Sequence, residues 1–426
     1  MTKKKPPPAA ARSAAASATT AAARSVPRSA TRSAAAAGVA APEAADEAGD
    51  ASDAGLPGDA GIQAPPPEEI YAEELALLAR WDAGPRPPSW KLTPRAVVTF
   101  IVGSGGEPLR AGGASREIGE KFVGDRGLVE RCVVTLAGER GLLLVGEPGT
   151  AKTMLSELLA AAISGDSSLV VQGTAGTAEE HLRYGWNYSM LIARGPEPEA
   201  LVASPVLSAM RRGAIARVEE ITRCLPEVQD ALVSILSDRR LSVPELGTLE
   251  PARRGFNVIA TANLRDKGVS EMSAALKRRF NFETVPPIAD LARETELVRR
   301  RAAEIVAEAG APLAVDDAVL DALVTVFRDL RLGRSVEGWP VERPTSVMST
   351  AEAVAVASAL GLAATYFPGE RDAAGLLPEY LLGVVMKDEP RDRGKLLAYW
   401  DASVKRRAEG DEPPWAELHA LRRMLE

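Results

Sequence analysis

The chain has 426 residues, with 51 lysines and arginines against 58 aspartates and glutamates, and a formal net charge of −7. This balance gives no general field for nucleic acid or anionic lipid, and no apolar run approaches the roughly 20 residues of a membrane span. Two cysteines, Cys132 and Cys224, are too few for a disulfide framework, so we expect a cytoplasmic chain. The length allows about two or three domains.

Residues 1–69 are rich in Ala, Ser and Pro and contain almost no large apolar side chains. Such a segment cannot form a packed core, so we predict a disordered tail. Its basic, acid-free beginning is also compatible with a transit peptide. Three lysines followed by three prolines would disrupt the amphipathic helix of a transit peptide, which favours the tail.

Residues 70–116 are predicted to form an N-terminal helical segment and a linker. Spaced leucines indicate a short helix over Ile70–Trp81. A second helix should follow Thr93 as its N-cap and stop at Gly103, and its apolar residues on most sides predict burial. Gly112–Arg116 has the composition of a linker.

Strand and helix patterns alternate over residues 117–287, whereas residues 288–426 show helical patterns alone. Alternation predicts a mostly parallel sheet covered by helices on both faces, an α/β core, followed here by an all-helical lid. The expected strands span residues 142–145, 168–171, 213–218, 256–261 and 280–285, with a helix over Pro226–Ser237. The expected lid helices span residues 291–309, 317–330, 346–366, 376–385, 395–408 and 415–425.

A Gly-rich turn between an apolar strand and a helix is the most informative stretch of the chain. Backbone N–H groups in such a turn, together with the helix dipole, suit the β-phosphate of a nucleotide. Lys152 would reach the β- and γ-oxygens of ATP, and the Thr153 hydroxyl would ligate Mg²⁺. Ala151 stands where glycine is usual, and we expect it to open the helix with a negative φ. Nucleotide binding is thus assigned to Gly146, Glu147, Pro148, Gly149, Thr150, Ala151, Lys152 and Thr153.

Polar side chains end two later strands. A carboxylate at Glu219 can hold the water shell of Mg²⁺, and one at Glu220 can polarise the attacking water, although a pair of glutamates could also begin a solvated loop. Glutamate is one methylene longer than the usual aspartate, so Glu219→Asp should preserve or raise turnover. Asn263 can hold the water against the γ-phosphate or simply cap its strand. His181 has no second histidine nearby, which favours a structural or surface role.

In this order, Gly146–Thr153, Val218-Glu219-Glu220, Asn263 and Arg278-Arg279-Phe280 resemble the motifs of AAA+ ATPases, and specifically the MoxR-type group of the helix-two-insert clade. The resemblance covers roughly residues 118–343. It implies a P-loop αβα sandwich with a helical lid, and a homo-oligomeric, typically hexameric ring that binds ATP and Mg²⁺ between subunits.

The resemblance also implies roles for individual residues. Glu219 matches the Walker B metal carboxylate, Glu220 the water-activating glutamate and Asn263 sensor one. Arg279 matches the arginine finger that reaches a neighbouring subunit, with Arg278 as its companion; spacing alone would leave both on a solvated helix end. The resemblance also implies that Leu201–Ser208 ends the helix-two insert and that Asp238–Pro251 forms a pore-facing hairpin. Arg343 stands two residues from the sensor-two position.

The function implied by the resemblance is a chaperone-like ATPase that remodels or matures partner proteins, with a von Willebrand A-type domain protein as the suggested partner. Two alternatives belong to other classes. A nucleic-acid-associated AAA+ motor would need a basic pore, and beyond the tail the acids slightly outnumber the bases. A nucleotide-gated scaffold would bind ATP but hydrolyse little of it.

Overall fold

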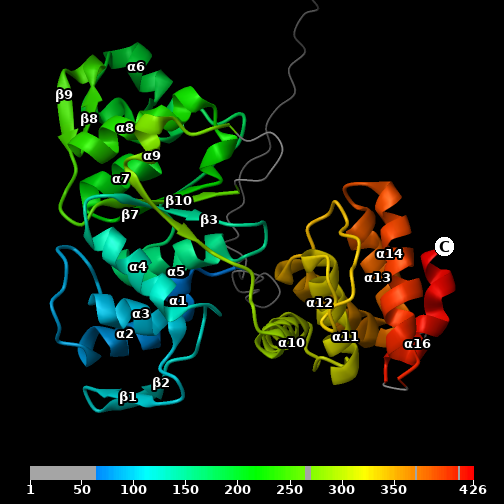
Figure 1. Cartoon of the computed structure of the whole chain (residues 1–426). Helices are drawn as coiled ribbons and strands as arrows, with labels where there is room; N and C mark the ends of the chain where they lie inside the picture. Colours follow the sequence, from blue (N-terminus) through cyan, green and yellow to red (C-terminus); the bar gives the residue numbers. More distant parts are fainter. Residues whose placement is uncertain (1–63, 264–269, 370–371, 411–412) are drawn as a thin grey trace, which may run out of the picture. The chain divides into compact units, whose positions relative to one another are not determined.

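The computed structural model describes residues 64–263, 270–369, 372–410 and 413–426 (Figure 1). Most of the predicted tail therefore lies outside the described residues. Its last part, residues 64–69, is described and contains the start of helix α1 (Pro67–Ile70), so regular structure begins before the predicted boundary. Within the described residues, no helix is long and apolar enough to cross a membrane.

A five-stranded parallel sheet forms the core, as predicted. Its strands lie in the order β11-β3-β10-β7-β4, and every pairing between them is parallel. The three inner strands are buried along their whole length, and their sequences are mostly apolar, with Arg217 and Glu219 in β7 among the exceptions. The strands are β3 (Gly141–Val145), β4 (Val170–Gln172), β7 (Ile215–Glu219), β10 (Asn257–Ala262) and β11 (Phe280–Thr284).

Each face of the sheet has its own apolar core, because successive strand residues point to opposite sides. Leu142 and Leu144 pack with the helices of one layer, and Leu143 and Val145 with those of the other. Figure 1 shows α4 and α5 on one side of the sheet and α7 and α8 on the other. The core helices are α4 (Arg126–Ala137), α5 (Lys152–Ser164), α7 (Pro205–Arg212), α8 (Pro226–Asp238) and α9 (Ala274–Lys277).

Helices α2 (Ala72–Trp81) and α3 (Pro94–Val102) precede the sheet and join the core on the α5 side. The predicted cap is confirmed, since the Thr93 hydroxyl accepts a hydrogen bond from the Ala96 amide at 3.2 Å. The predicted linker at Gly112–Arg116 is wrong. Strands β1 (Pro108–Ala111) and β2 (Ala114–Glu117) form an antiparallel hairpin there, because two glycines with positive φ make a two-residue turn.

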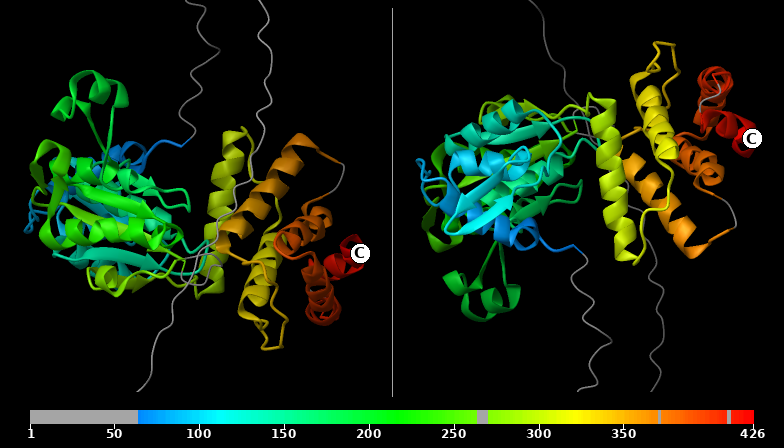
Figure 2. Two further views of the ribbon diagram at one scale, coloured as in Figure 1. Left: turned by 90° about the horizontal axis from the view of Figure 1, so that it is seen from above. Right: turned by 90° about the horizontal axis from the view of Figure 1, so that it is seen from below.

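Two segments extend from the core as excursions, each built on a pair of antiparallel strands. Strands β5 and β6 pair antiparallel and carry helix α6 at their tip, which projects from the core in Figure 2; this excursion includes the start of the segment predicted as the end of the helix-two insert. Strands β8 and β9 form the hairpin predicted within Asp238–Pro251. The elements are β5 (Tyr184–Trp186), α6 (Tyr188–Arg194), β6 (Leu201–Ala203), β8 (Arg240–Val243) and β9 (Thr248–Pro251).

Beyond the sheet the described chain is helical, as predicted, and the helices share one apolar cluster. The predicted helix over residues 346–366 begins later, at Thr350, because Ser349 and Glu352 form a capping box. The predicted helix over residues 395–408 is α14 and α15 joined by a π turn, Trp400–Val404. The helices are α10 (Leu291–Glu308), α11 (Asp317–Leu332), α12 (Thr350–Tyr366), α13 (Ala373–Met386), α14 (Arg393–Tyr399), α15 (Lys405–Ala408) and α16 (Trp415–Ala420).

Candidate nucleotide-binding site

The Gly-rich turn joins the end of β3 to the first residue of α5, so its backbone lies at the carboxyl edge of the sheet. It is tightly packed: a Cβ on Gly146 would lie 2.6 Å from the Val285 carbonyl oxygen, and Gly149 adopts a φ of +74°. The Lys152 ammonium donates to the carbonyl oxygens of Gly146 and Glu147, at 3.2 and 2.8 Å. These two hydrogen bonds hold the Lys152 ammonium against the backbone of the turn.

The prediction for Ala151 is wrong. Ala151 does not open the helix with a negative φ; it is the N-cap, at φ +63° and ψ +26°, in the left-handed region. A Cβ in this region approaches the following carbonyl oxygen, which costs an L-residue about 1–2 kcal/mol. Glycine avoids this cost, which is the physical reason that glycine is usual here.

The Glu219 carboxylate ends β7 and is almost fully buried, with 2% of its surface exposed. Its Oε2 accepts hydrogen bonds from the hydroxyls of Thr153, at 3.1 Å, and Thr261, at 2.7 Å. Its Oε1 accepts from Ser156, at 2.5 Å, and from the guanidinium of Arg217, at 3.0 Å. The carboxylate is therefore fixed beside the first turn of α5.

A hydroxyl and a carboxylate side by side are hard oxygen donors of the kind that Mg²⁺ prefers. Thr153 and Glu219 hence fit the cation that usually accompanies ATP, with phosphate oxygens and water supplying the remaining ligands. Within the described residues, no group of three or more histidine, cysteine, aspartate or glutamate side chains could hold a metal by itself.

Glu220 and Asn263 come together at the same edge of the sheet. The Asn263 amide nitrogen donates to Glu220 Oε1 at 2.8 Å, and Glu220 has a φ of +53°, in the left-handed region. Thr261 connects the two glutamates, since its hydroxyl accepts from the Glu220 amide at 2.9 Å and donates to Glu219. The pair of strand-end glutamates therefore has two different environments.

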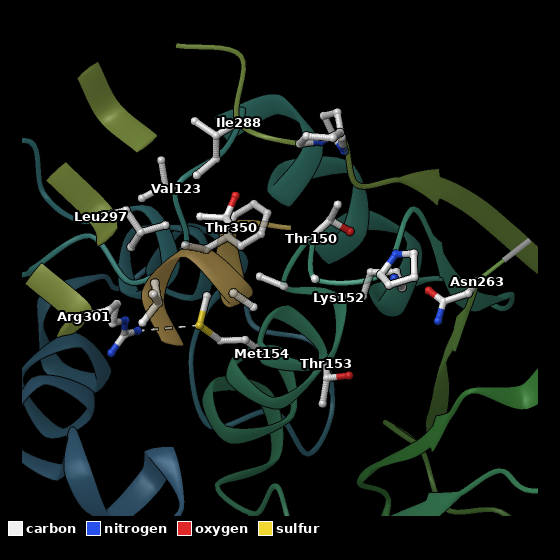
Figure 3. A pocket seen from close by; sticks show the side chains of 18 of the residues that line it. Val123, Thr150, Lys152, Thr153, Met154, Asn263, Ile288, Leu297, Arg301 and Thr350 are labelled. Carbon is white, nitrogen blue, oxygen red and sulfur yellow. Dashed lines mark hydrogen bonds between the residues drawn. The ribbon is translucent and has the colours of Figure 1, made fainter. Parts of the chain in front are cut away.

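A cavity of about 660 Å³ is lined by Lys152, Thr153, Glu220 and Asn263. At one end lie Lys152, Thr153 and Asn263, as Figure 3 shows, together with Glu220. At the other end, Met154 and Arg301 are labelled close together, and the arginine donates to the Met154 sulfur at 3.7 Å. Figure 3 places Val123, Ile288 and Leu297 toward this second end, and the cavity lining also includes the apolar residues Phe122, Ile305 and Val354. Such a cavity can take a flat apolar base at one end and phosphates at the other.

Three predicted arginines lie outside this cavity. Arg279 follows α9 and donates to the Ser237 hydroxyl at 2.7 Å and to the Ala275 carbonyl oxygen at 2.8 Å, whereas Arg278 beside it is exposed. Arg343 lines a different cavity of about 460 Å³, next to Glu147. The structure therefore gives Arg343 no place among the residues lining the larger cavity.

The two cysteines and His181 take no part in the site. Burial raises the pKa of the Cys132 thiol to about 12 and raises that of Cys224 as well, and both are free cysteines. The His181 ring accepts a hydrogen bond from the Ala178 amide at 3.0 Å and the residue is exposed. These contacts agree with the structural or surface role predicted for the histidine.

Residues that the sequence reasoning missed are those that orient the predicted ones. Ser156, Arg217 and Thr261 hold Glu219, but each lies inside an element whose local pattern only indicates burial. A polar or charged residue within an apolar strand is the one signal that could have drawn attention to Arg217 and Thr261. The apolar end of the cavity gave no comparable signal, because it is assembled from distant segments.

Two family models match the chain in succession. Residues 141–280 match the AAA domain of the dynein-related subfamily, and residues 292–426 match the YehL-like AAA+ ATPase C-terminal domain. The first confirms the predicted AAA+ family for the segment that carries the Gly-rich turn, Glu219, Glu220 and Asn263. Neither description names the MoxR group.

Individual proteins show the same relationship. Uncharacterized protein YehL of Escherichia coli (strain K12) is 47% identical over 367 residues, which cover 85% of this chain and 98% of that protein. Uncharacterized protein SH1500 of Staphylococcus haemolyticus (strain JCSC1435) is 35% identical over 142 residues, 33% of this chain and 53% of that protein.

Among solved structures, NtrX from Brucella abortus in complex with ATP is 17% identical, with a TM-score of 0.42 over 70% of this chain and 67% of that one. This resemblance is distant and adds nothing about function. The extent of the YehL match and the two consecutive family matches lead to one assignment: the chain belongs to the YehL-like AAA+ ATPases.

Proposed function

We propose that this chain is a MoxR-type AAA+ ATPase that couples ATP hydrolysis to the remodelling or maturation of partner proteins. The observation that carries the hydrolytic part is the meeting of Lys152, Glu220 and Asn263 at one end of a single cavity. Lysine, carboxylate and amide are the groups needed to neutralise phosphate charge, polarise a water and hold that water in place. The apolar end of the cavity would receive the base.

Each residue would have a distinct task. Lys152, which here donates to two loop carbonyls, would donate instead to the β- and γ-phosphate oxygens. Glu220 would accept a hydrogen bond from the attacking water, and Asn263, whose amide nitrogen contacts Glu220 Oε1, would hold that water in place. Thr153 and Glu219 would hold Mg²⁺, which supplies positive charge to the transferred phosphoryl group.

Partner remodelling needs surfaces that contact other proteins. The tip helix α6 exposes Tyr188 to 66% and Ile192 to 86%, and the β8–β9 hairpin exposes Leu249 to 62%. Large apolar side chains at the ends of two excursions favour contact with another protein chain. In a homo-hexameric ring, these excursions would engage the client, with a von Willebrand A-type domain protein as the proposed partner. The two free cysteines support a cytoplasmic location.

The test measures oligomer mass and partner binding on the purified chain. With ATP and Mg²⁺ we expect a hexamer by mass photometry, and binding of von Willebrand A-type domain proteins from the same cells. Tyr188→Ser with Ile192→Ser should abolish partner binding and leave ATP turnover within about twofold, because α6 lies far along an excursion from the cavity residues. Arg194→Ser on the same helix is the matched control. A monomer under all nucleotide conditions, or partner binding unaffected by the double substitution, would contradict the proposal.

A nucleotide-gated scaffold with little hydrolysis is the second candidate. The observation in its favour is the ion pair that Glu219 makes with a buried arginine, since an already paired carboxylate attracts a cation less strongly. Turnover separates the two candidates: a scaffold would bind ATP with little release of phosphate in any oligomeric state.

A further inference from the structure

Arg217 is a buried arginine in the strand that carries the catalytic glutamates. It lies two residues before Glu219 in β7, so both side chains project from the same face of the sheet, toward α5. Only 4% of its surface is exposed. Burying a guanidinium in a sheet costs free energy unless each N–H group has a hydrogen-bond partner. The partners of Arg217 therefore indicate its role.

Those contacts surround Glu219 and the start of α5. Nη2 donates to Glu219 Oε1 at 3.0 Å, Nε donates to the Ser156 hydroxyl at 3.1 Å, and Nη1 donates to the Ser167 carbonyl oxygen at 2.9 Å. Ser156 in turn donates to the same Glu219 oxygen, at 2.5 Å. The guanidinium is thus locked in one orientation, with its charge against one oxygen of the carboxylate.

The two oxygens of Glu219 consequently have different surroundings. Oε1 faces Arg217 and Ser156, away from the cavity, while Oε2 accepts from Thr153, whose residue lines the cavity. We propose that Arg217 is a positioning residue that balances the charge of Glu219, so that the phosphate end of the site accepts a nucleotide before Mg²⁺ is bound. The proposal rests on the assignment of this cavity to ATP.

The electrostatic reason is the repulsion between like charges in a site of low dielectric. A bare buried carboxylate beside Thr153 would oppose the triphosphate until a cation came between them. A carboxylate paired with a guanidinium at 3.0 Å opposes it much less. The expected consequence is a small difference between nucleotide affinity with Mg²⁺ and nucleotide affinity with a chelator.

Arg217 also accounts for a glutamate where aspartate is usual, and this changes the expectation for Glu219→Asp. The longer side chain contacts Arg217 and Thr153 at once. An aspartate is one methylene shorter and cannot maintain both contacts, which would leave a buried guanidinium short of its partner. We now expect Glu219→Asp to lower stability and turnover, where the sequence alone favoured preserved or faster turnover.

The test measures the dissociation constant of a fluorescent ATP analogue in excess Mg²⁺ and in excess EDTA. For Arg217→Met we expect affinity in EDTA to fall by at least about tenfold, with a much smaller change in Mg²⁺. In a Glu219→Gln background, Arg217→Met should no longer weaken binding in EDTA, because the buried Glu219 charge is absent. The other carboxylate beside Arg217, Glu157 at 3.7 Å from Nη1, is 37% exposed, so water screens its charge. This double variant replaces a buried ion pair with neutral side chains of similar volume, so it should fold even where Arg217→Met does not.

Arg212→Met is the matched control, since Arg212 forms an exposed ion pair with Asp166 and should leave both affinities unchanged. An equal loss of affinity in Mg²⁺ and in EDTA, or a loss that persists in the Glu219→Gln background, would overturn the role of Arg217. If Arg217→Met does not fold, the double variant must bind in EDTA as tightly as the parent; weaker binding would overturn the proposal. Failure of the parent itself to bind the analogue would instead reject the assignment of the cavity.

Discussion

Arg279→Ala is expected to bind ATP as the parent does and to hydrolyse it about 10³-fold more slowly, since an arginine finger supplies charge to the transition state alone. The side chain lies outside the cavity of its own subunit and is held by Ser237 and the Ala275 carbonyl oxygen. An effect of Arg279 on hydrolysis must then act on the nucleotide bound by a neighbouring subunit. To reach it, the Arg279 side chain would release the Ser237 hydroxyl and contact a phosphate oxygen instead.

Mixed rings test this action between subunits. Arg279→Ala subunits retain their own Glu220, and Glu220→Gln subunits retain Arg279, so some interfaces in a mixture would combine the two intact residues. We expect the mixture to hydrolyse ATP faster than either variant alone. Arg278→Ala, which alters the exposed neighbouring residue, should have a smaller effect. Absence of rescue in mixed rings, or a larger loss with Arg278→Ala, would reject Arg279 as the finger.

Glu220→Gln is expected to bind ATP normally and to lower turnover at least about 10²-fold. Glutamine preserves the shape of the side chain and an oxygen that can accept from the Asn263 amide, but it lacks the negative charge that polarises the attacking water. Stopped-flow binding of ATP and release of inorganic phosphate would be measured on the same sample. Glu227→Gln, at an exposed glutamate in the first turn of α8, is the control.

The opposite result would reassign the glutamates. If Glu220→Gln hydrolyses ATP as fast as the parent while Glu219→Gln does not, then Glu219 acts on the water and Glu220 on the cation. The geometry opposes this outcome, because both oxygens of Glu219 are already engaged with hydroxyl or guanidinium donors.

Much of the fold could be predicted because its signals are local. The cap at Thr93 needed only a threonine before a proline and an apolar run, and the strands of the sheet are short, apolar and separated by amphipathic helices. The hairpin at residues 108–117 was missed because its strands have four residues each and the second is exposed throughout, so nothing but the Gly112-Gly113 pair marked a turn.

The site was predictable in part for the same reason. The Gly-rich turn, Glu219, Glu220 and Asn263 end strands, and parallel strands bring their carboxyl ends to one edge. The left-handed backbone at Ala151 was missed because an alanine carries no sign of a positive φ. The contact between Arg217 and Ser156 depends on where α5 lies against β7. The place of Arg343 depends on how the chain folds back near Glu147. Local pattern determines neither.

ATP binding and turnover by the purified chain, measured beside Lys152→Ala, test most directly whether this cavity is where the ATPase works. Lys152 lines the cavity and donates to two loop carbonyl oxygens, so its removal should leave the circular dichroism spectrum and the melting temperature nearly unchanged. We expect the parent to bind and hydrolyse ATP, and Lys152→Ala to bind it at least about tenfold more weakly with no measurable turnover. A folded Lys152→Ala variant that binds and hydrolyses ATP like the parent would contradict the assignment.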